Sequence, residues 1–409
     1  MSERIQAPRG TYDVLPEEAA RRAEVEKIAG RILGGAGYGR IETPIFESTE
    51  LFARGVGEST DIVRKEMYTF DDGGGRLVTL RPEATAGISR AYVEHGMHKL
   101  PQPVRLWALG PFFRRERAQA GRFREFWQID AEVFGSEAPA VDAETIVLLA
   151  EVLEALGVKG TRLLLGSLGT PETRADYRER LRGYLHEHED DLPAEVRERI
   201  DLNPMRAFDA AGAAPVMEGA PRLMDELAPE DAEHFAEVRA LLDDAGLAYE
   251  IDPTLVRGLD YYTRTVFEFT SDALGAQSGV AGGGRYDKLV EQIGGQPTPA
   301  VGWAAGVERA LLAGEGLEAS PTAVDLYVAL ADDDARRAGF RLANEARRAG
   351  LAAQVEVAGR SLKGQLKHAN RLGARYVAVI AGDGASVKEM QTGEERTMPL
   401  DEVIATVSR

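Results

Sequence analysis

The stretch GPFFRRERAQAGRFREF, residues 110–126, has the densest pattern in the chain. It joins two runs with the composition of strands, Val104–Leu109 and Phe123–Phe134. Between residues 114 and 124, five arginines occupy eleven positions. Because a guanidinium fork fits phosphate oxygens and its face stacks on a base, this strand–loop–strand is suited to clamp a nucleoside triphosphate, with Phe126 as an aromatic face. The alternative is a solvated basic loop on an acidic protein.

Helical and strand-like segments alternate on both sides of this element. We expect helices at Ala19–Leu33 and Val141–Leu156, and further strands at Arg40–Phe46 and Arg76–Leu80. Residues 168–250 differ, because they are acidic, rich in Ala, Glu and Arg, and broken by prolines into short helical runs. They contain no chemical motif and are typical of an inserted helical module.

Strands and glycine-rich turns return after residue 250, and a small, polar linker follows at 313–321. The expected elements are strands at Thr263–Thr270, Gly279–Gly284 and Val301–Ala305, and a helix from Gly306 to Leu312. Beyond the linker, we expect strands at Val324–Ala329, Ala352–Val357 and Tyr376–Ile380, and helices at Asp332–Ala349 and Ser361–Leu372. This alternation predicts an α/β domain with a mostly parallel sheet. The predicted parts are 1–167, 168–250, 251–320 and 321–409.

The composition is that of a globular protein of two to four domains, with 409 residues, 28% charged and 44% hydrophobic. Absence of cysteine excludes a disulfide scaffold and a cysteine-ligated zinc site, and fits a reducing compartment. No apolar segment is long enough for a signal core or a membrane span, so we expect a cytoplasmic protein without membrane contact.

The net charge of −18 is unevenly distributed along the chain. Residues 321–409 hold 13 Lys+Arg against 12 Asp+Glu, a net of +1, so the first 320 residues carry −19. In the predicted helix 361–372, Lys363, Lys367 and Arg371 share one face at i, i+4, i+8. This stripe is suited to a phosphate backbone, and the alternative is a solvated helix face.

A second candidate motif is Leu80–Thr85, in which Glu83 follows a proline at the end of a predicted strand. A carboxylate there can hold a cationic amine, with the Thr85 hydroxyl beside it. The alternative is a helix N-terminus, where Pro at N1 and an acid that complements the dipole are both common.

Two further motifs each contain one arginine. In Leu255–Tyr262, Arg257 can neutralise charge on a transferring phosphoryl group, and a tyrosine hydroxyl can bond an imidazole nitrogen. In Val301–Arg309, a strand runs into a helix and places Arg309 in the first turn, where it can stack on adenine or reach a γ-phosphate. The alternatives are a turn with Arg–Asp pairing and a surface Glu–Arg pair.

Three consecutive glycines, 282–284, allow the backbone to approach a ligand closely, although a hairpin turn would also use them. Neither a GxGxxG fingerprint nor a GxxxxGK[ST] loop occurs, so a bound nucleotide would be held by another design. No residue pattern has the spacing of a metal site, so no protein side chain is assigned to a metal.

Taken in this order, the segments resemble those of class II aminoacyl-tRNA synthetases, and specifically the histidyl-tRNA synthetase family, over essentially the whole chain. Residues 39–47, 110–126 and 301–309 look like the three class motifs, with Pro44 at a dimer-interface position. Residues 255–262 and 282–287 look like the two histidine-specific motifs. The resemblance implies an α+β protein: an antiparallel-sheet catalytic domain with a helical insertion, followed by an α/β anticodon-binding domain.

The resemblance also implies an activity, which is ATP-dependent activation of L-histidine and its transfer to tRNA, with Mg²⁺ accompanying ATP and with a homodimer as the assembly. For ATP, the resemblance implies Arg114 and Arg257 at the α-phosphate, with Phe126, Arg309 and Glu116 also in contact with the nucleotide. For histidine, it implies Glu83, Thr85 and Gln128 at the amine and carboxylate, Glu132 and Tyr262 at the imidazole nitrogens, and Tyr261 as a further histidine-binding residue. For tRNA, it implies Arg117, Gln119 and Arg122 at the acceptor end and Lys363, Lys367 and Arg371 in the anticodon domain.

One alternative comes from another functional class. Synthetase-like regulatory subunits of ATP phosphoribosyltransferase resemble the catalytic domain but lack the anticodon domain and part of the histidine motifs. Both features are intact here, which argues for the synthetase. A tRNA-binding module without catalysis would need a damaged arginine set, whereas Arg114, Arg257 and Arg309 are all present.

Overall fold

The computed structural model describes residues 4–57, 60–116, 119, 121–275, 278–317 and 324–408. The chain forms two compact units, Met1–Glu318 and Ala319–Arg409. Each is described by itself.

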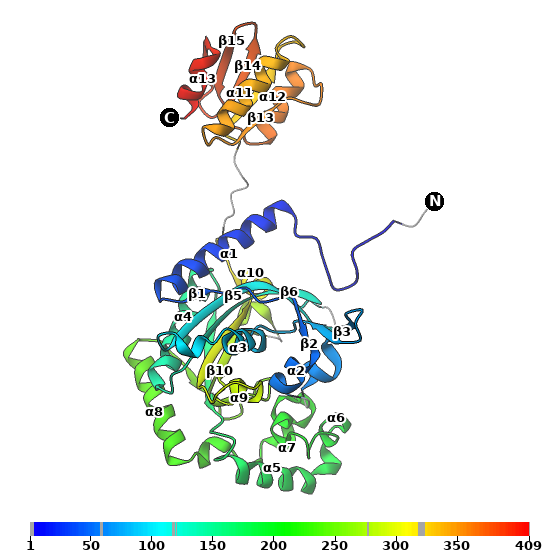
Figure 1. Cartoon of the computed structure of the whole chain (residues 1–409), viewed down its shortest axis with the longest axis vertical. Coiled ribbons are helices and arrows are strands. Elements are labelled where there is room, and N and C mark those ends of the chain that lie inside the picture. The colour runs from blue at the N-terminus through cyan, green and yellow to red at the C-terminus, as the bar shows by residue number, and fades with distance from the viewer. Residues whose placement is uncertain are drawn as a thin grey trace. The chain divides into compact units, whose positions relative to one another are not determined.

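The first unit is built on one large sheet with strand order β1-β5-β6-β11-β10-β9-β7-β8 (Figure 1). The strands are β1 (Gly39–Arg40), β5 (Val104–Phe113), β6 (Glu125–Phe134), β7 (Thr161–Ser167), β8 (Glu250–Ile251), β9 (Thr263–Ser271), β10 (Gly279–Arg285) and β11 (Ala300–Gly306). All central pairings are antiparallel, and only the two-residue edge strands β1 and β8 pair in parallel. The expected antiparallel catalytic sheet is confirmed.

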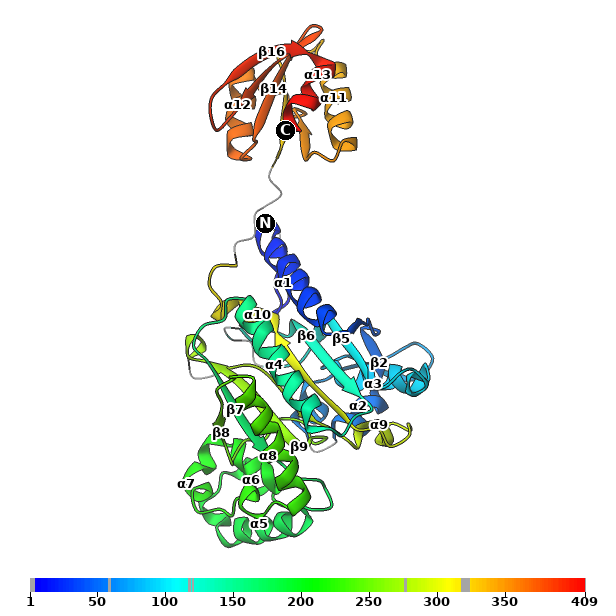
Figure 2. The same ribbon diagram turned by 90° about the vertical axis from the view of Figure 1, so that its left-hand side faces the viewer.

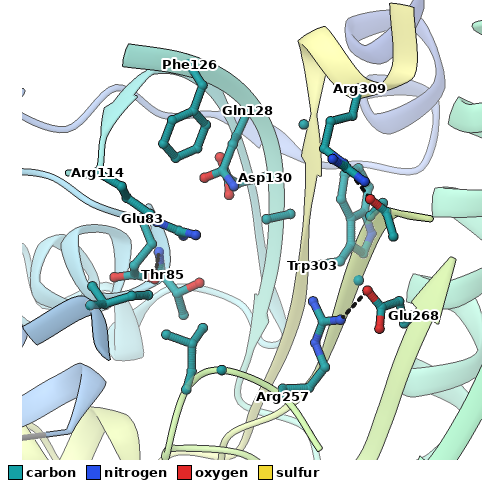
Figure 3. Close-up of a pocket in the computed structure, with 18 of the residues that line it drawn as sticks. Glu83, Thr85, Arg114, Phe126, Gln128, Asp130, Arg257, Glu268, Trp303 and Arg309 are labelled. Carbon is teal, nitrogen blue, oxygen red and sulfur yellow. Dashed lines mark hydrogen bonds and ion pairs between the residues drawn. The ribbon is translucent and has the colours of Figure 1, made fainter. Parts of the chain in front are cut away.

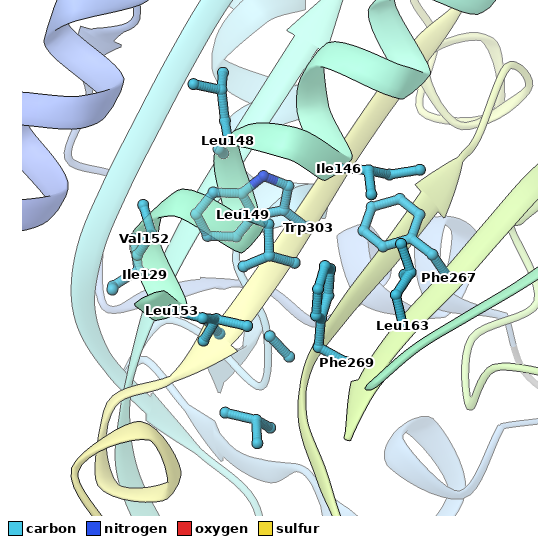
Figure 4. Packing of buried hydrophobic residues seen from close by; sticks show 14 of the residues in the cluster. Ile129, Ile146, Leu148, Leu149, Val152, Leu153, Leu163, Phe267, Phe269 and Trp303 are labelled. Atoms are coloured by element: carbon cyan, nitrogen blue, oxygen red, sulfur yellow. The ribbon is translucent and has the colours of Figure 1, made fainter. Parts of the chain in front are cut away.

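Three helices cover one face of this sheet: α1 (Pro16–Gly35), α4 (Pro139–Ala155) and α8 (Pro229–Asp244). Figure 4 shows the side chains between α4 and the strands, with Trp303, Phe267 and Phe269 from the sheet packed against leucines of the helix. The helix α8 falls inside the predicted insertion, yet its Phe235 and Val238 are part of this core. The sheet is therefore closed on this face, and the cleft described below lies on the other.

The second face carries α3 (Thr85–Glu94) and the shorter helices of the insertion. These are α5 (Ala175–Glu187), α6 (Ala194–Arg197) and α7 (Ala214–Met217), with several single 3-10 turns between them (Figure 2). Their apolar residues share one cluster with Tyr261 and Tyr262, so the insertion packs against the first histidine-like motif, residues 255–262.

The expected strand Arg40–Phe46 is wrong for most of its length. Gly39–Arg40 joins the large sheet opposite Leu106, whereas Phe46 pairs with Leu80 in a separate sheet of order β2-β4-β3. Its strands are β2 (Phe46–Ser48), β3 (Tyr68–Asp71) and β4 (Leu77–Leu80), and α2 (Thr49–Val56) follows β2. The run is split because its ends serve two sheets, and Pro44 between them has no N–H to donate to a ladder.

The second unit has a mixed five-stranded sheet of order β13-β12-β14-β15-β16. Its elements are β12 (Leu326–Leu330), α11 (Arg336–Arg348), β13 (Ala353–Val355), α12 (Leu362–Arg371), β14 (Tyr376–Ala381), β15 (Gly384–Glu389), β16 (Glu395–Pro399) and α13 (Leu400–Val407). β12 pairs in parallel with β13 and β14, but the last two pairings are antiparallel. The predicted mostly parallel sheet therefore needs correction, since two residues link β14 to β15 and a parallel crossover needs about a dozen.

Candidate active site

A cleft opens on the second face of the large sheet, with an empty volume of about 1150 Å³. Side chains from β6, β9, β10, β11, α3 and the segment before β9 line it (Figure 3). The lining includes these residues named from the sequence: Glu83, Thr85, Arg114, Glu116, Arg122, Phe126, Gln128, Arg257, Tyr261, Tyr262 and Arg309. Gly282 and Tyr286 of the glycine-rich motif line it as well, so five separate motifs meet in one pocket, although they span more than half of the chain.

Three buried carboxylates lie together at the cleft, and we call them the acidic wall: Glu83 and Asp130 line the cleft, and Glu132 lies behind the lining. Glu83 lies just before α3, and its carboxylate accepts hydrogen bonds from the backbone N–H of Thr85 and Ala86, both at 2.9 Å. This is the helix-capping arrangement that the sequence offered as the alternative reading. Glu83 therefore caps the N-terminus of α3 and also lines the cleft.

Glu132 lies deeper than the cleft lining. One of its carboxylate oxygens accepts a hydrogen bond from the Thr85 hydroxyl at 2.6 Å, and the other accepts one from the Tyr286 hydroxyl. A side chain at Gly302 on the neighbouring strand would overlap this carboxylate, since an added Cβ would lie 1.6 Å from one oxygen. Glu132 thus holds Thr85 and Tyr286 in place, and its predicted contact with the substrate stays a prediction.

Asp130 lies between Gln128 and Glu132 on β6, and because side chains alternate along a strand all three face the cleft side. Asp130 is 1% exposed. Within the described residues, neither of its carboxylate oxygens has a hydrogen-bond partner, and the same holds for the side-chain oxygen of Gln128.

Burial and mutual repulsion shift the titration of the acidic wall. Burial raises the pKa of Glu132 to about 8. Burial, then the charges of Glu132 and Glu83, raise the pKa of Asp130 well above its usual range. Burial also raises the pKa of Glu83, against the helix N–H groups that lower it. A wall of this kind favours either protons or a cationic ligand.

Three arginines line the cleft from other directions, and each is anchored by a hydrogen bond or an ion pair. Arg114 donates from Nε to the Pro82 carbonyl at 2.8 Å, and its guanidinium lies 5.3 Å from the Phe126 ring centre. Arg309 donates from Nε to the Gly279 carbonyl at 2.5 Å.

Arg257 is held by an ion pair with Glu268 at 3.1 Å. It passes so close to Gly282 that an added Cβ there would lie 2.7 Å from its guanidinium. The glycine run 282–284 is a strand, β10, rather than a hairpin turn, and its lack of side chains makes room for this arginine.

Tyr261 and Tyr262 are both buried at the cleft, with ring centres 4.7 Å apart. Burial raises the pKa of each phenol, most strongly that of Tyr261, so both hydroxyls remain neutral donors. Tyr286 packs against Tyr261 at 5.5 Å, and it belongs to the glycine-rich motif identified from the sequence.

The loop of the second motif is described only in part. Arg117 lies outside the described residues. Gln119 and Arg122 form an isolated β-bridge, and Arg122 also pairs with Glu116 at 3.4 Å. Of these, Glu116 and Arg122 line the cleft.

Two predicted sites are not part of the cleft lining. Lys363, Lys367 and Arg371 are exposed on α12 of the second unit, as the spacing predicts. Pro44 is exposed in the loop that precedes β2. Beside it, Phe46 and Leu77 of the small sheet are about half exposed, at 53% and 59%.

Sequence reasoning missed Asp130, Glu268 and Trp303 in the lining. Asp130 had a signal, because Gln128 and Glu132 were both assigned and the residue midway between them on a strand shares their face. Glu268 and Trp303 follow only from the pairing of β9, β10 and β11, which the sequence does not reveal.

An antiparallel sheet whose cleft joins arginines from the second and third motifs to an acidic wall defines a class II aminoacyl-tRNA synthetase. Residues 10–310 match the family model described as histidyl-tRNA synthetase, and residues 325–409 match an anticodon binding domain. The chain belongs to the histidyl-tRNA synthetase family.

Individual relatives agree with this assignment. The histidine–tRNA ligase of Halorhodospira halophila is 49% identical, over 98% of this chain and 97% of its own. The apo structure of S. aureus histidyl-tRNA synthetase superposes with a TM-score of 0.84 at 36% identity, covering 99% of this chain and 100% of that one. A Bacillus halodurans structure titled as an ATP phosphoribosyltransferase regulatory subunit/histidyl-tRNA synthetase has a TM-score of 0.67 at 22% identity, with 93% and 100% covered, and shows the fold alone.

Proposed function

We propose that this chain activates L-histidine with ATP and transfers the histidyl group to the 3′ end of histidine tRNA. One observation carries the proposal: Arg114, Arg257 and Arg309 line the same cleft as Gln128 and Tyr262. A triphosphate needs the arginines, and an amino acid with an imidazole needs the acceptors and hydroxyls on the opposite side.

Activation is an in-line displacement at phosphorus. A carboxylate oxygen of histidine attacks the α-phosphorus of ATP. The bond from that phosphorus to the oxygen that bridges the α- and β-phosphates breaks, and pyrophosphate leaves. In the second step, a terminal ribose hydroxyl of tRNA attacks the carbonyl, AMP leaves, and the hydroxyl proton is released. Neither step requires a side-chain nucleophile, so the protein contributes positioning and charge stabilisation.

Arg114 and Arg257 stabilise the charge that develops on the α-phosphoryl oxygens. They belong to different elements, Arg114 after β5 and Arg257 before β9, and Figure 3 shows them on different sides of the cleft. Their anchoring bonds to Pro82 and Glu268 fix both guanidinium groups before ATP binds, which lowers the cost of reorganisation during the reaction.

Adenine stacks between Phe126 and Arg309. Figure 3 shows these side chains on opposite sides of the opening, Phe126 from β6 and Arg309 from α10 (Val307–Ala313). An aromatic ring and a guanidinium plane both present a face to a purine. Glu116 also lines the cleft and completes the nucleotide site.

Histidine binds along the acidic wall. Glu83, Thr85 and Gln128 hold its amine and carboxylate region, and Tyr261, Tyr262 and Glu132 surround the imidazole. The tyrosine hydroxyls suit the ring because a neutral imidazole has one donor and one acceptor nitrogen.

Mg²⁺ bound together with ATP would supply positive charge beside the phosphates. The described residues hold no group of three or more His, Asp or Glu side chains fit to cage a metal. Glu116 in the cleft is the carboxylate that fits as a ligand, and phosphate oxygens with water would complete a shell of the kind Mg²⁺ prefers.

tRNA binds at two places. Arg117, Gln119 and Arg122 in the second-motif loop meet the acceptor end, and the exposed stripe Lys363, Lys367 and Arg371 meets the anticodon arm through its phosphates. Of these residues, Gln119 and Arg122 of the loop and the three cations of α12 are exposed, as sequence-independent nucleic-acid contacts require.

A homodimer forms through the small sheet and the loop at Pro44. The half-exposed apolar side chains Phe46, Phe70 and Leu77 gather on that sheet, where a second copy would cover them.

No helix among the described residues is both long and apolar enough to cross a bilayer. We infer a cytoplasmic protein.

Pyrophosphate exchange tests the proposal. Purified protein with ATP, Mg²⁺ and histidine should incorporate labelled pyrophosphate into ATP, and should do so with none of the other amino acids. Exchange with a different amino acid, or no exchange at all from folded protein, would reject it. The second outcome would fit the regulatory-subunit alternative.

A further inference from the structure

The acidic wall contains one carboxylate whose oxygens are not engaged within the described residues. Glu83 uses both oxygens on the start of α3, and Glu132 uses both on Thr85 and Tyr286. Asp130 is as deeply buried as either, yet both of its oxygens lack a partner in the described part of the chain.

A buried carboxylate without partners is costly in the ligand-free protein, because it gives up hydration without receiving hydrogen bonds in return. The neighbours increase the cost, since Glu132 and Glu83 both raise the pKa of Asp130. The nearby cations, Arg81 and Arg114, lower it less than the other causes raise it. A ligand that carries a positive charge would stabilise the ionised carboxylate of Asp130 in this place.

Gln128 supplies the complementary observation. Its side-chain oxygen also lacks a partner within the described residues, and it is two positions from Asp130 on the same face of β6. The residues opposite Asp130 on the adjacent strands are Ala108 and Ala304, so no large side chain fills the space beside it. Three unpartnered acceptor oxygens therefore belong to two residues of the cleft lining, and an ammonium group has three N–H donors.

We propose that Asp130 binds the α-ammonium group of the amino-acid substrate, together with the side-chain oxygen of Gln128. The inference rests on the proposed function and adds a residue to it. Ammonium binding leaves the carboxylate of the same substrate directed towards Arg114 and the phosphate, because Asp130 repels it and Arg114 attracts it. Asp130 thus contributes to which end of histidine faces ATP.

Two ligands that differ at the amine test the proposal. Histidinol keeps the ammonium and lacks the carboxylate, whereas 3-(imidazol-4-yl)propionate keeps the carboxylate and lacks the ammonium. Calorimetry should show that Asp130→Asn weakens histidinol about tenfold or more, as expected for loss of a charged hydrogen bond, and changes propionate binding little or strengthens it. Glu291→Gln, which changes an exposed carboxylate outside the cleft lining, is the matched control and should leave the ratio of the two affinities unchanged.

Equal weakening of both ligands would assign Asp130 to the imidazole or to the fold and would overturn the proposal, as would unchanged histidinol binding. A raised KM for MgATP with an unchanged KM for histidine would place a metal there instead. Thermal unfolding separates a structural role, because Asp130→Asn should raise the Tm of the ligand-free protein, and a lower Tm would contradict the proposal. If wild-type protein exchanges pyrophosphate with histidine, these outcomes bear on Asp130 alone; if it does not, the proposed function itself fails.

Discussion

The two sides of the cleft are both charged, but the acidic wall is buried whereas the three arginines are half-buried, and their charges are stabilised differently. Arg114, Arg257 and Arg309 are each tied to a carbonyl or carboxylate, and a guanidinium keeps its charge at any pH that the fold survives. The acidic wall can instead take up protons, and the pKa values of Asp130 and Glu132 are raised accordingly. The arginine side is thus ready before ATP binds, whereas the acidic wall gains its full charge when a cation arrives.

The largest effect should come from the arginine side. Arg257→Ala should reduce histidine-dependent pyrophosphate exchange by about a hundredfold or more, the usual result of removing one preorganised charge donor from a transition state. Because the variant also strands the carboxylate of Glu268, the double variant Arg257→Ala/Glu268→Gln is the control. Exchange restored to the wild-type rate in the double variant would show that Arg257 serves only to pair Glu268.

A smaller effect should come from the strand that separates the two sides. Gly302→Ala places a Cβ against the Glu132 carboxylate and the Ala131 carbonyl, so the variant should lose about 1–3 kcal/mol of stability and bind histidine more weakly. Gly183→Ala in α5 is the matched control, since nothing lies within 4 Å of its added Cβ and the helix should gain slightly. Chemical unfolding measures both, and equal stabilities would show that β11 shifts to accept the methyl group.

The smallest effect should be a pH dependence of the acidic wall. The pKa of Glu132 is about 8 in the fold, against an ordinary value of 4.5 for the unfolded chain. Between these values the folded protein holds a proton that the unfolded chain has lost, so the ligand-free protein loses stability as pH rises through this window. Glu132→Gln removes this titration, and its Tm should fall less between pH 6 and pH 8 than that of the wild type. Parallel pH profiles for the two proteins would contradict the raised pKa.

The sequence predicted local features well and pairings poorly. The second-motif strand–loop–strand was found because its arginines lie between two apolar runs, and α1 and α4 were found because their periodicity is long. The strand expected at Arg40–Phe46 was wrong, because its ends belong to two sheets and composition does not reveal which partner a strand will find.

Within the site, the same distinction holds. Motif positions such as Arg114 and Arg257 could be named individually, and the structure brings them to one cleft. The sequence could not predict that Glu132 accepts two hydrogen bonds whereas Asp130 accepts none within the described residues. Both outcomes depend on which hydroxyl and backbone N–H groups of neighbouring elements lie within reach. Hydrogen-bond partners across a sheet are set by register, and no single-residue pattern encodes that.

The strand order of the large sheet has a consequence for synthesis. β11 lies between β6 and β10, yet it is the last of the sheet's strands to leave the ribosome, about 170 residues after β6. Until β11 is made, β6 pairs with β5 on one edge only. Its other edge is open, and water can reach its carboxylates there. A nascent chain that stalls before residue 300 therefore holds neither a finished sheet nor a ligand site, and it offers an unpaired strand to other chains. Completion of β11 converts the two halves into an enzyme in a single late event.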